Sequence, residues 1–224
     1  MQTKMKQYPA KIFLAEKQLV HENATARTAS VFGGVNGWFG NLYMVNDETL
    51  APGSSVQLLP EIDTTIIIPI VGDLIVVTQN KESALPCGEA MVINGRQSEA
   101  IKLQNGYDKD LINYLQIRIH SIDQPPQVVS KSFHLDCADD ELNTILDNKD
   151  FKVFIGKMQM RQELSFPCGE EDYGVFCFVI QGSFEVCGRL LHHRDGLAIW
   201  DAEEIEIESL GKESILLLIE IRLN

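Results

Sequence analysis

Residues 38–72, WFGNLYMVNDETLAPGSSVQLLPEIDTTIIIPIVG, decide the fold of this 224-residue chain. The stretch contains short apolar runs separated by residues that favour turns, such as the Ala-Pro-Gly tripeptide at residues 51–53. Runs of this length, bounded by glycine, proline, asparagine and aspartate, are typical of short β-strands. The stretch therefore predicts a series of strands joined by tight turns.

The same pattern continues over the rest of the chain. Strands are expected at residues 40–45, 56–59, 65–71, 74–78, 90–93, 114–120, 129–135, 153–161, 174–180, 184–186, 196–200, 205–208 and 214–222. One helix is expected at residues 138–146, where Asp139, Asp140 and Glu141 would interact favourably with the positive end of its dipole. Many strands and a single helix predict an all-β protein.

Two adjacent prolines, Pro125 and Pro126, separate two sets of expected strands. Proline cannot take part in a central strand, so we expect a domain boundary here, with domains at residues 1–122 and 123–224. A weak internal repeat supports the division, because residues 66–77 and 175–186 each contain an apolar strand, a glycine and a second strand. Two similar sets of strands predict two antiparallel β-barrels or sandwiches, since both arrangements remove exposed strand edges.

Composition and net charge argue against some classes of function, such as membrane proteins and nucleic-acid-binding proteins. Hydrophobic residues make up 45% of the chain and charged residues 23%, which is typical of a soluble globular protein. No apolar run approaches the roughly 18 residues of a membrane span, and the N-terminus has no apolar signal segment, so a cytoplasmic location is expected. The net charge of −13 repels phosphate groups, which argues against direct binding to nucleic acid or to an anionic membrane surface.

The cysteines and histidines do not form a recognisable metal motif. The five cysteines are an odd number without a Cys-x-x-Cys pair, so we expect reduced thiols. His192 and His193 are adjacent, and adjacent residues of a strand point to opposite faces. They would bind one metal ion together only if this segment were a loop.

Residues 39–53, Gly72, residues 97–99 and residues 115–117 resemble the pirin family, which includes quercetinase-like enzymes. The resemblance spans most of residues 27–120. The second half resembles the family's C-terminal cupin domain more loosely, through Gly182 and the segment LLHHRDGLAI at residues 190–199. The resemblance implies a bicupin, a protein with two antiparallel jelly-roll cupin barrels.

In the pirin family, the N-terminal cupin holds a metal ion with three histidines and one glutamate, supplied by a His-Pro-His motif and a later His-x-Glu. The matching positions here are Leu59, Glu61, Gln97 and Glu99. Leucine cannot coordinate a metal, and carboxylates or amides suit magnesium, calcium or manganese better than the transition metals that imidazoles hold. The resemblance therefore implies that the family metal, such as iron, copper, nickel or manganese, has been lost and that no cofactor is needed.

Glu61, Asp63, Gln97 and Glu99 are the candidate ligand-pocket residues. Two buried carboxylates without a cation raise one another's pKa, so these groups would form a weak site for a hard metal ion or an acid/base pair. The alternative is that both glutamates are ordinary solvated groups, because most carboxylates in proteins are exposed.

Three functions follow from the resemblance. We prefer a small-molecule-binding or regulatory protein that uses the cavity of the N-terminal barrel, since barrels of this size hold one small ligand. The second is a metal-dependent dioxygenase of quercetin 2,3-dioxygenase type acting on an aromatic substrate, which would make the chain an enzyme. The third is a protein-interaction module, like the family's transcription cofactors, whose acidic residues Glu203, Glu204, Glu206 and Glu208 would bind a basic partner.

Overall fold

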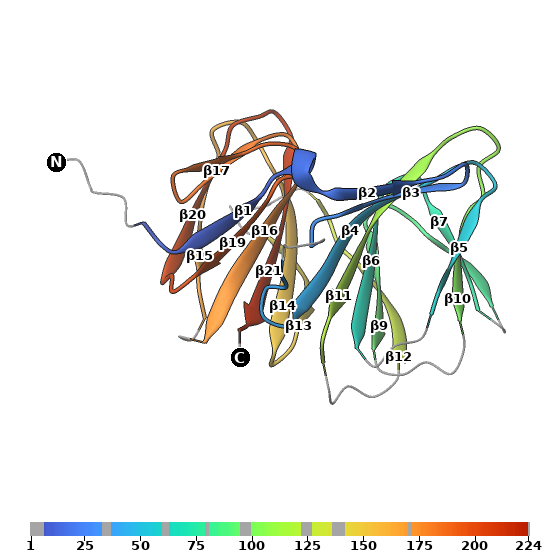
Figure 1. Ribbon diagram of the computed structural model, residues 1–224, viewed down its shortest axis with the longest axis horizontal. Coiled ribbons are helices and arrows are strands. Elements are labelled where there is room, and N and C mark those ends of the chain that lie inside the picture. The colour runs from blue at the N-terminus through green and yellow to red at the C-terminus, as the bar shows by residue number, and fades with distance from the viewer. Residues whose placement is uncertain are drawn as a thin grey trace. The chain divides into compact units, whose positions relative to one another are not determined.

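The computed structural model in Figure 1 describes residues 7–32, 37–59, 63–78, 81–94, 100–121, 127–135, 142–169 and 172–223. Strands dominate these ranges, with one 3-10 turn, η1, at Ala15–Lys17. Within the described ranges, no helix is long and apolar enough to cross a membrane.

The chain folds into two compact units. We call Gln18–Phe133 the N-terminal unit, and Met1–Lys17 together with His134–Asn224 the C-terminal unit. These limits differ from the predicted ranges 1–122 and 123–224. The first strand of the chain is hydrogen-bonded into the C-terminal unit, and the strand that follows the two prolines pairs within the N-terminal unit.

The N-terminal unit consists of two antiparallel sheets. Its strands are β2 (Leu19–Glu22), β3 (Ala26–Ser30), β4 (Leu42–Leu50), β5 (Ser55–Leu58), β6 (Thr64–Val71), β7 (Leu74–Val77), β8 (Glu82–Leu85), β9 (Glu89–Asn94), β10 (Ile101–Asn105), β11 (Ile112–Ile119) and β12 (Gln127–Ser132). One sheet has the order β12-β9-β6-β11-β4-β3-β2 and the other β5-β10-β7-β8. Apolar side chains from both sheets, such as Ile67 and Leu103, form one buried cluster between them.

The C-terminal unit is built in the same way. Its strands are β1 (Ala10–Phe13), β13 (Asn143–Asp147), β14 (Phe151–Met158), β15 (Glu163–Pro167), β16 (Tyr173–Gln181), β17 (Phe184–Val186), β18 (Arg189–Leu191), β19 (Gly196–Trp200), β20 (Glu204–Ser209) and β21 (Ser214–Arg222). The sheet orders are β1-β19-β16-β21-β14-β13 and β15-β20-β17-β18. The side chains between these sheets are almost all apolar, among them Val175, Leu197 and Leu218.

The two units repeat one strand order. The series β12-β9-β6-β11-β4-β3 corresponds to β1-β19-β16-β21-β14-β13, and β5-β10-β7-β8 corresponds to β15-β20-β17-β18. Gly72 joins β6 to β7 and Gly182 joins β16 to β17, with φ of 73° and 82°, a conformation that favours glycine. The internal repeat read from the sequence is therefore a repeat of structure.

The prediction of an all-β bicupin is confirmed, with the refinement that each unit is a pair of packed sheets rather than a closed barrel. The helix predicted at residues 138–146 is wrong where the structure describes it, because residues 143–147 form β13 and pair with β14. Ile145 and Leu146 are buried there, and the β-branched Thr144 and Ile145 suit a strand. The acidic residues on which the helix was based, residues 139–141, lie outside the described residues.

Candidate functional site

The structure describes two of the five candidate site residues. Leu59 follows β5 and is 66% exposed, and Asp63 precedes β6 and is only 4% exposed. Glu61, Gln97 and Glu99 lie outside the described residues. Whether these three side chains surround a ligand or are solvated therefore stays a prediction.

The register of three neighbouring strands defines a second group of polar residues in the N-terminal unit. On β11, Tyr114 lies opposite Glu48 of β4, and Gln116 lies opposite Asn46. Residues paired across antiparallel strands, and every second residue along a strand, point to the same face of a sheet. Tyr114 belongs to the buried cluster between the two sheets, so the side chains of this set face the interior of the unit.

Two further residues complete this group. Arg118 lies two positions beyond Gln116 on β11, and Thr28 of β3 lies opposite Glu48. We call Thr28, Asn46, Glu48, Gln116 and Arg118 the polar belt. All except the half-buried Thr28 are buried, which is unusual for side chains of these types.

Hydrogen bonds join Thr28 and Asn46 to Glu48, and Gln116 to Arg118. Thr28 Oγ1 donates to Glu48 Oε2 at 2.5 Å, and Asn46 Nδ2 donates to Glu48 Oε1 at 3.1 Å. When the Gln116 amide is oriented with its oxygen toward Arg118, that oxygen accepts hydrogen bonds from Arg118 Nε and Nη2 at 3.0 and 3.2 Å. The belt thus presents a carboxylate, held by two neutral hydrogen-bond donors, at one place and a guanidinium at another.

Burial raises the pKa of Glu48, because a carboxylate loses its hydration inside the protein. The hydrogen bonds from Thr28 and Asn46 oppose this rise, and the neighbouring negative charge of Asp47 adds to it. Burial also raises the pKa of Tyr114, and the charge of Glu48 contributes to that rise. Both groups therefore favour their protonated forms more than exposed groups would.

Asp63 lies in a small aromatic cluster at the start of β6. The Tyr43 hydroxyl group donates a hydrogen bond to Asp63 Oδ2, and the Tyr43 ring stacks on His120 with 4.2 Å between centroids. The exposed Trp38 contacts His120 edge-on at 5.2 Å. Burial raises the pKa of Asp63, while the positive charges of Arg118 and His120 lower it. Asp63, expected as a pocket residue, is thus a buried carboxylate with cationic neighbours.

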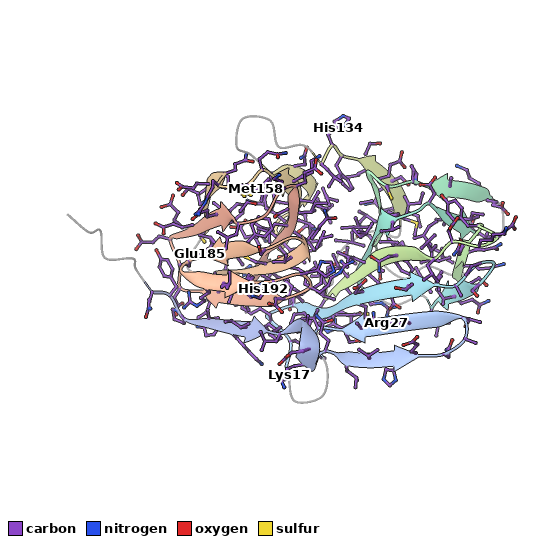
Figure 2. The ribbon with its side chains drawn as sticks, turned by 90° about the horizontal axis from the view of Figure 1, so that it is seen from above. Lys17, Arg27, His134, Met158, Glu185 and His192 are labelled. Atoms are coloured by element: carbon purple, nitrogen blue, oxygen red, sulfur yellow. The ribbon has the colours of Figure 1, made fainter. Side chains whose placement is uncertain are left out.

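The C-terminal unit provides an internal comparison for the belt. A Cβ atom at Gly72 would contact Ile112, and one at Gly182 would contact Ser214, so Ile112 and Ser214 occupy equivalent places. Ile112 pairs with Leu50, and Ser214 pairs with Met158, which Figure 2 labels.

Counting along the paired strands from these residues gives the equivalents of the belt. Gly156 corresponds to Glu48, Phe154 to Asn46, and Leu218 to Gln116. The glycine has no side chain, and the other two equivalents are apolar residues that pack in the core of the C-terminal unit. The fold therefore does not require polar residues at these positions.

One equivalent position in the C-terminal unit is charged. Glu220 corresponds to Arg118 and is 3% exposed, and its carboxylate lies 3.3 Å from Lys152 Nζ. Its Oε1 also accepts a hydrogen bond from the backbone N–H of Gly169 at 2.7 Å. This buried carboxylate has a cationic partner.

The described residues do not fit a transition-metal site. Leu59 has no donor atom, and among the residues that the structure describes, no three histidine, cysteine, aspartate or glutamate side chains lie close enough together to hold a metal ion. The belt instead offers amide and hydroxyl groups together with one carboxylate and one guanidinium.

Sequence reasoning missed the polar belt, although one signal was present. Tyr114, Gln116 and Arg118 alternate with apolar residues on β11, which places three polar groups on one face. On β4, the predicted strand ended at residue 45, because Asn46 and Asp47 resemble the start of a turn. The observed strand continues to Leu50 and carries both Asn46 and Glu48 into the sheet.

Comparisons with known proteins agree with this fold. Residues 137–221 match the family model described as the quercetinase C-terminal cupin domain. The crystal structure of the bacterial pirin YhhW from Escherichia coli in complex with nickel(II) is 15% identical, with a TM-score of 0.85, and covers 96% of this chain and 100% of that chain.

A second similar structure is quercetin 2,3-dioxygenase from Acinetobacter baumannii, which is 13% identical with a TM-score of 0.75 over 95% of this chain and 79% of that chain. No curated protein sequence matches this chain. At these low identities, the structural likeness shows the fold alone.

Proposed function

We propose that this chain, which has the fold of a pirin-like bicupin, binds a small polar organic molecule inside its N-terminal unit and acts as a binding or regulatory protein without a transition metal. The observation that carries the proposal is the polar belt. The same scaffold in the C-terminal unit places Gly156, Phe154 and Leu218 where the belt has Glu48, Asn46 and Gln116.

Buried polar groups weaken a core unless they are fully paired. Leaving one buried donor or acceptor without a partner costs about 1–3 kcal/mol, and more for a charged group. The apolar cluster of the C-terminal unit avoids this cost at the positions equivalent to Asn46, Glu48 and Gln116. The belt side chains hydrogen-bond one another, but Glu48 has no cationic partner among the described residues. A bound molecule that offset this buried charge would stabilise the N-terminal unit, which is the reason to expect one there.

The proposed absence of a transition metal rests on the residues at the family ligand positions. Leu59 is exposed and has no donor atom, and Glu61, Gln97 and Glu99 would offer oxygen donors in place of imidazoles. We expect protein purified without chelators to contain iron, copper, nickel and manganese far below one ion per chain. Elemental analysis of the purified protein measures this.

A thermal-shift screen tests the proposed binding. The protein would be heated with each member of a library of small polar metabolites, and we expect some of them to raise the melting temperature in a saturable way, because a ligand stabilises the folded state that binds it. Gln116→Leu, which introduces the residue that the C-terminal unit has at this place, should abolish those shifts.

Gln57→Leu is the matched control for Gln116→Leu. Gln57 lies on β5 of the same unit but is exposed, so the same substitution there should leave ligand-induced shifts unchanged. Equal loss of the shifts in both variants, or no saturable shift for any compound in the wild-type protein, would refute the proposed site.

A dioxygenase of quercetin 2,3-dioxygenase type is the second candidate function. It is favoured by the match of residues 137–221 to the quercetinase C-terminal cupin family model. Such an enzyme would contain one metal ion per chain and consume oxygen in the presence of quercetin. An oxygen electrode and elemental analysis of the same preparation separate it from the binding protein, for which we expect neither result.

A protein-interaction module is the third candidate, favoured by an acidic sheet surface. Glu163, Glu208 and Glu185 lie side by side across β15, β20 and β17, and Glu204 and Glu206 share their face of the sheet. Glu185 is labelled in Figure 2. A basic protein would be expected to bind there, and a pull-down whose partners are lost when Glu204, Glu206 and Glu208 become glutamine would favour this function.

We further propose a cytoplasmic location, with no direct binding to nucleic acid or to membranes. The net charge of −13 supports the second part, and the free state of Cys87, Cys168, Cys177 and Cys187 is consistent with a reducing compartment.

A further inference from the structure

Glu48 is a buried carboxylate whose hydrogen-bond donors among the described residues are neutral. The side chain is 8% exposed, and its two oxygens accept hydrogen bonds from Thr28 and Asn46. Among the described residues, no lysine, arginine or histidine pairs with it. The nearest charged influence is Asp47, which has the same sign.

The two arginines on the neighbouring strands do not change this balance. Arg118 is on the same face of the sheet, but its guanidinium bonds Gln116 and lies close enough to Asp63 to influence that carboxyl group. Arg27, labelled in Figure 2, is adjacent to Thr28 on β3. Adjacent strand residues point to opposite faces, so Arg27 is directed away from Glu48.

The other buried glutamate among the described residues, Glu220, has a different environment. Glu220 of β21 has Lys152 Nζ at 3.3 Å and a backbone N–H donor at 2.7 Å. Removing a carboxylate from water is strongly unfavourable unless a positive charge compensates it. Lys152 supplies that positive charge to Glu220, whereas none of the described lysines, arginines or histidines supplies one to Glu48.

The surroundings of Glu48 also indicate the shape of a partner. Leu50, two residues along β4, and Tyr114 opposite are members of the buried apolar cluster, and so is Ile112. Each of the three is 1% exposed, so a partner that reached Glu48 would be enclosed by apolar side chains that moved to admit it, with one polar group at Glu48. A hydrated inorganic cation gains no stability from contact with apolar side chains, whereas the hydrocarbon part of an organic amine does.

Resting on the proposed small-molecule function, we infer that the ligand of the N-terminal unit is an organic amine with an apolar body, whose ammonium group pairs with the Glu48 carboxylate. Thr28 and Asn46 orient the carboxylate, since each donates a hydrogen bond to one of its oxygens. The ammonium group supplies the positive charge that Lys152 supplies to Glu220 in the other unit.

Matched pairs of probes test this inference. Benzylamine and cyclohexylamine are cations at pH 7, and benzyl alcohol and cyclohexanol are neutral molecules of nearly the same size and shape. Isothermal titration calorimetry of the full chain should give dissociation constants at least about tenfold lower for each amine than for its alcohol, because hydrogen bonds to charged groups are stronger than those between neutral groups. Benzoate, an anion, should not bind.

Glu48→Gln should remove the preference for amines over alcohols, because the amide keeps the size of the side chain but not its charge. Glu163→Gln is the matched control, since it removes the same charge from an exposed position of the C-terminal unit, and it should leave the preference unchanged. Circular dichroism spectra of both variants establish that they are folded. If Glu48→Gln does not fold, Glu48→Asp provides the test, because its shorter side chain should weaken amine binding severalfold more than alcohol binding.

The outcomes separate this inference from the proposed function. Amines that bind no more tightly than their alcohols, or a preference that survives in Glu48→Gln, overturn the amine inference, while ligands found in the metabolite screen would still support a binding protein. Failure of both amines to bind also overturns it. The proposed function fails only when the metabolite screen also yields no ligand.

Discussion

Glu48 is the residue at which stability and the proposed function conflict most clearly. Its carboxylate is buried, and its pKa is raised above the ordinary value of 4.5, so the folded state holds its proton more tightly than the unfolded state does. For such a group, stability is fully present below the unfolded pKa and is lost as the pH rises through the folded pKa. The charged form of Glu48 therefore destabilises the unliganded protein at neutral pH.

Glu48→Gln should accordingly stabilise the unliganded protein as the pH increases. The melting temperatures of the variant and the wild type should be similar near pH 4, and the variant should melt higher by several degrees at pH 8, given shifts of about 2–4 °C per kcal/mol for chains of this size. Differential scanning calorimetry across this range measures the gap. A gap that is constant with pH would show that ionisation of Glu48 is not responsible.

Tyr43 provides a second test at the residue scale. Its hydroxyl group donates a hydrogen bond to the buried Asp63, and bonds to charged groups contribute about 1.5–3 kcal/mol. Tyr43→Phe should lower the free energy of unfolding by about that amount in urea titrations. Tyr107→Phe removes a hydroxyl group that accepts a hydrogen bond from the exposed backbone N–H of Asp73, and it should cost less than about 1 kcal/mol. Equal losses in the two variants would mean that Asp63 does not depend on Tyr43.

At the scale of elements, the strands were the most predictable part of the structure. The strands at residues 65–71 and 74–78 were predicted correctly, because each is a continuous apolar run and Gly72, which has a positive φ, lies between them. Strand β13 was mistaken for a helix, because pairing with β14 is a tertiary contact that local sequence does not reveal.

The candidate site was less predictable than the fold, for a physical reason. Asp63 was identified because it lies two residues after a family ligand position, whereas Glu48 and Arg118 come to share one interior face only through the register of β4 and β11. A one-residue change of register would turn these side chains to the other face. The alternation of residues along β11 indicates a polar face, but it does not identify the residues of other strands that this face contacts.

Gly72 tests the turn between β6 and β7. Its φ is 73°, and a Cβ atom there would lie 2.7 Å from Ile112 Cγ2. Gly72→Ala should therefore lower the free energy of unfolding by more than about 1 kcal/mol, since it combines backbone strain with a clash. Gly53 has a similar φ of 66° with open space around its Cβ position, so Gly53→Ala should show the strain alone and a smaller loss. Urea titration gives both values, and a Gly53→Ala loss as large as that of Gly72→Ala would contradict the role of the clash.

At the scale of the whole molecule, one strand order encloses two different kinds of interior. The C-terminal unit fills its interior with apolar side chains, and the N-terminal unit places the polar belt at equivalent positions. The C-terminal interior is thus a packed core, and the N-terminal interior combines a core with a candidate site.

Leu218→Gln tests this division, because it introduces into the C-terminal unit the residue type that Gln116 has in the belt. Leu218 is fully buried, so loss of its packing and an unpaired amide should cost about 2–5 kcal/mol. Leu190 of β18 in the same unit is 53% exposed, and Leu190→Gln should change stability by less than about 0.5 kcal/mol. Chemical denaturation compares the two variants, and a C-terminal unit that tolerates Leu218→Gln without loss would not be a packed core.

The most direct test of the account is methyl NMR of the protein titrated with the tightest ligand from the metabolite screen. We predict saturable shifts for methyl groups of the N-terminal interior, including Ile67 and Ile112, and none for Leu216 and Leu218 of the C-terminal interior. Shifts centred on the C-terminal interior, or on neither interior, would contradict the claim that the polar belt forms the binding site.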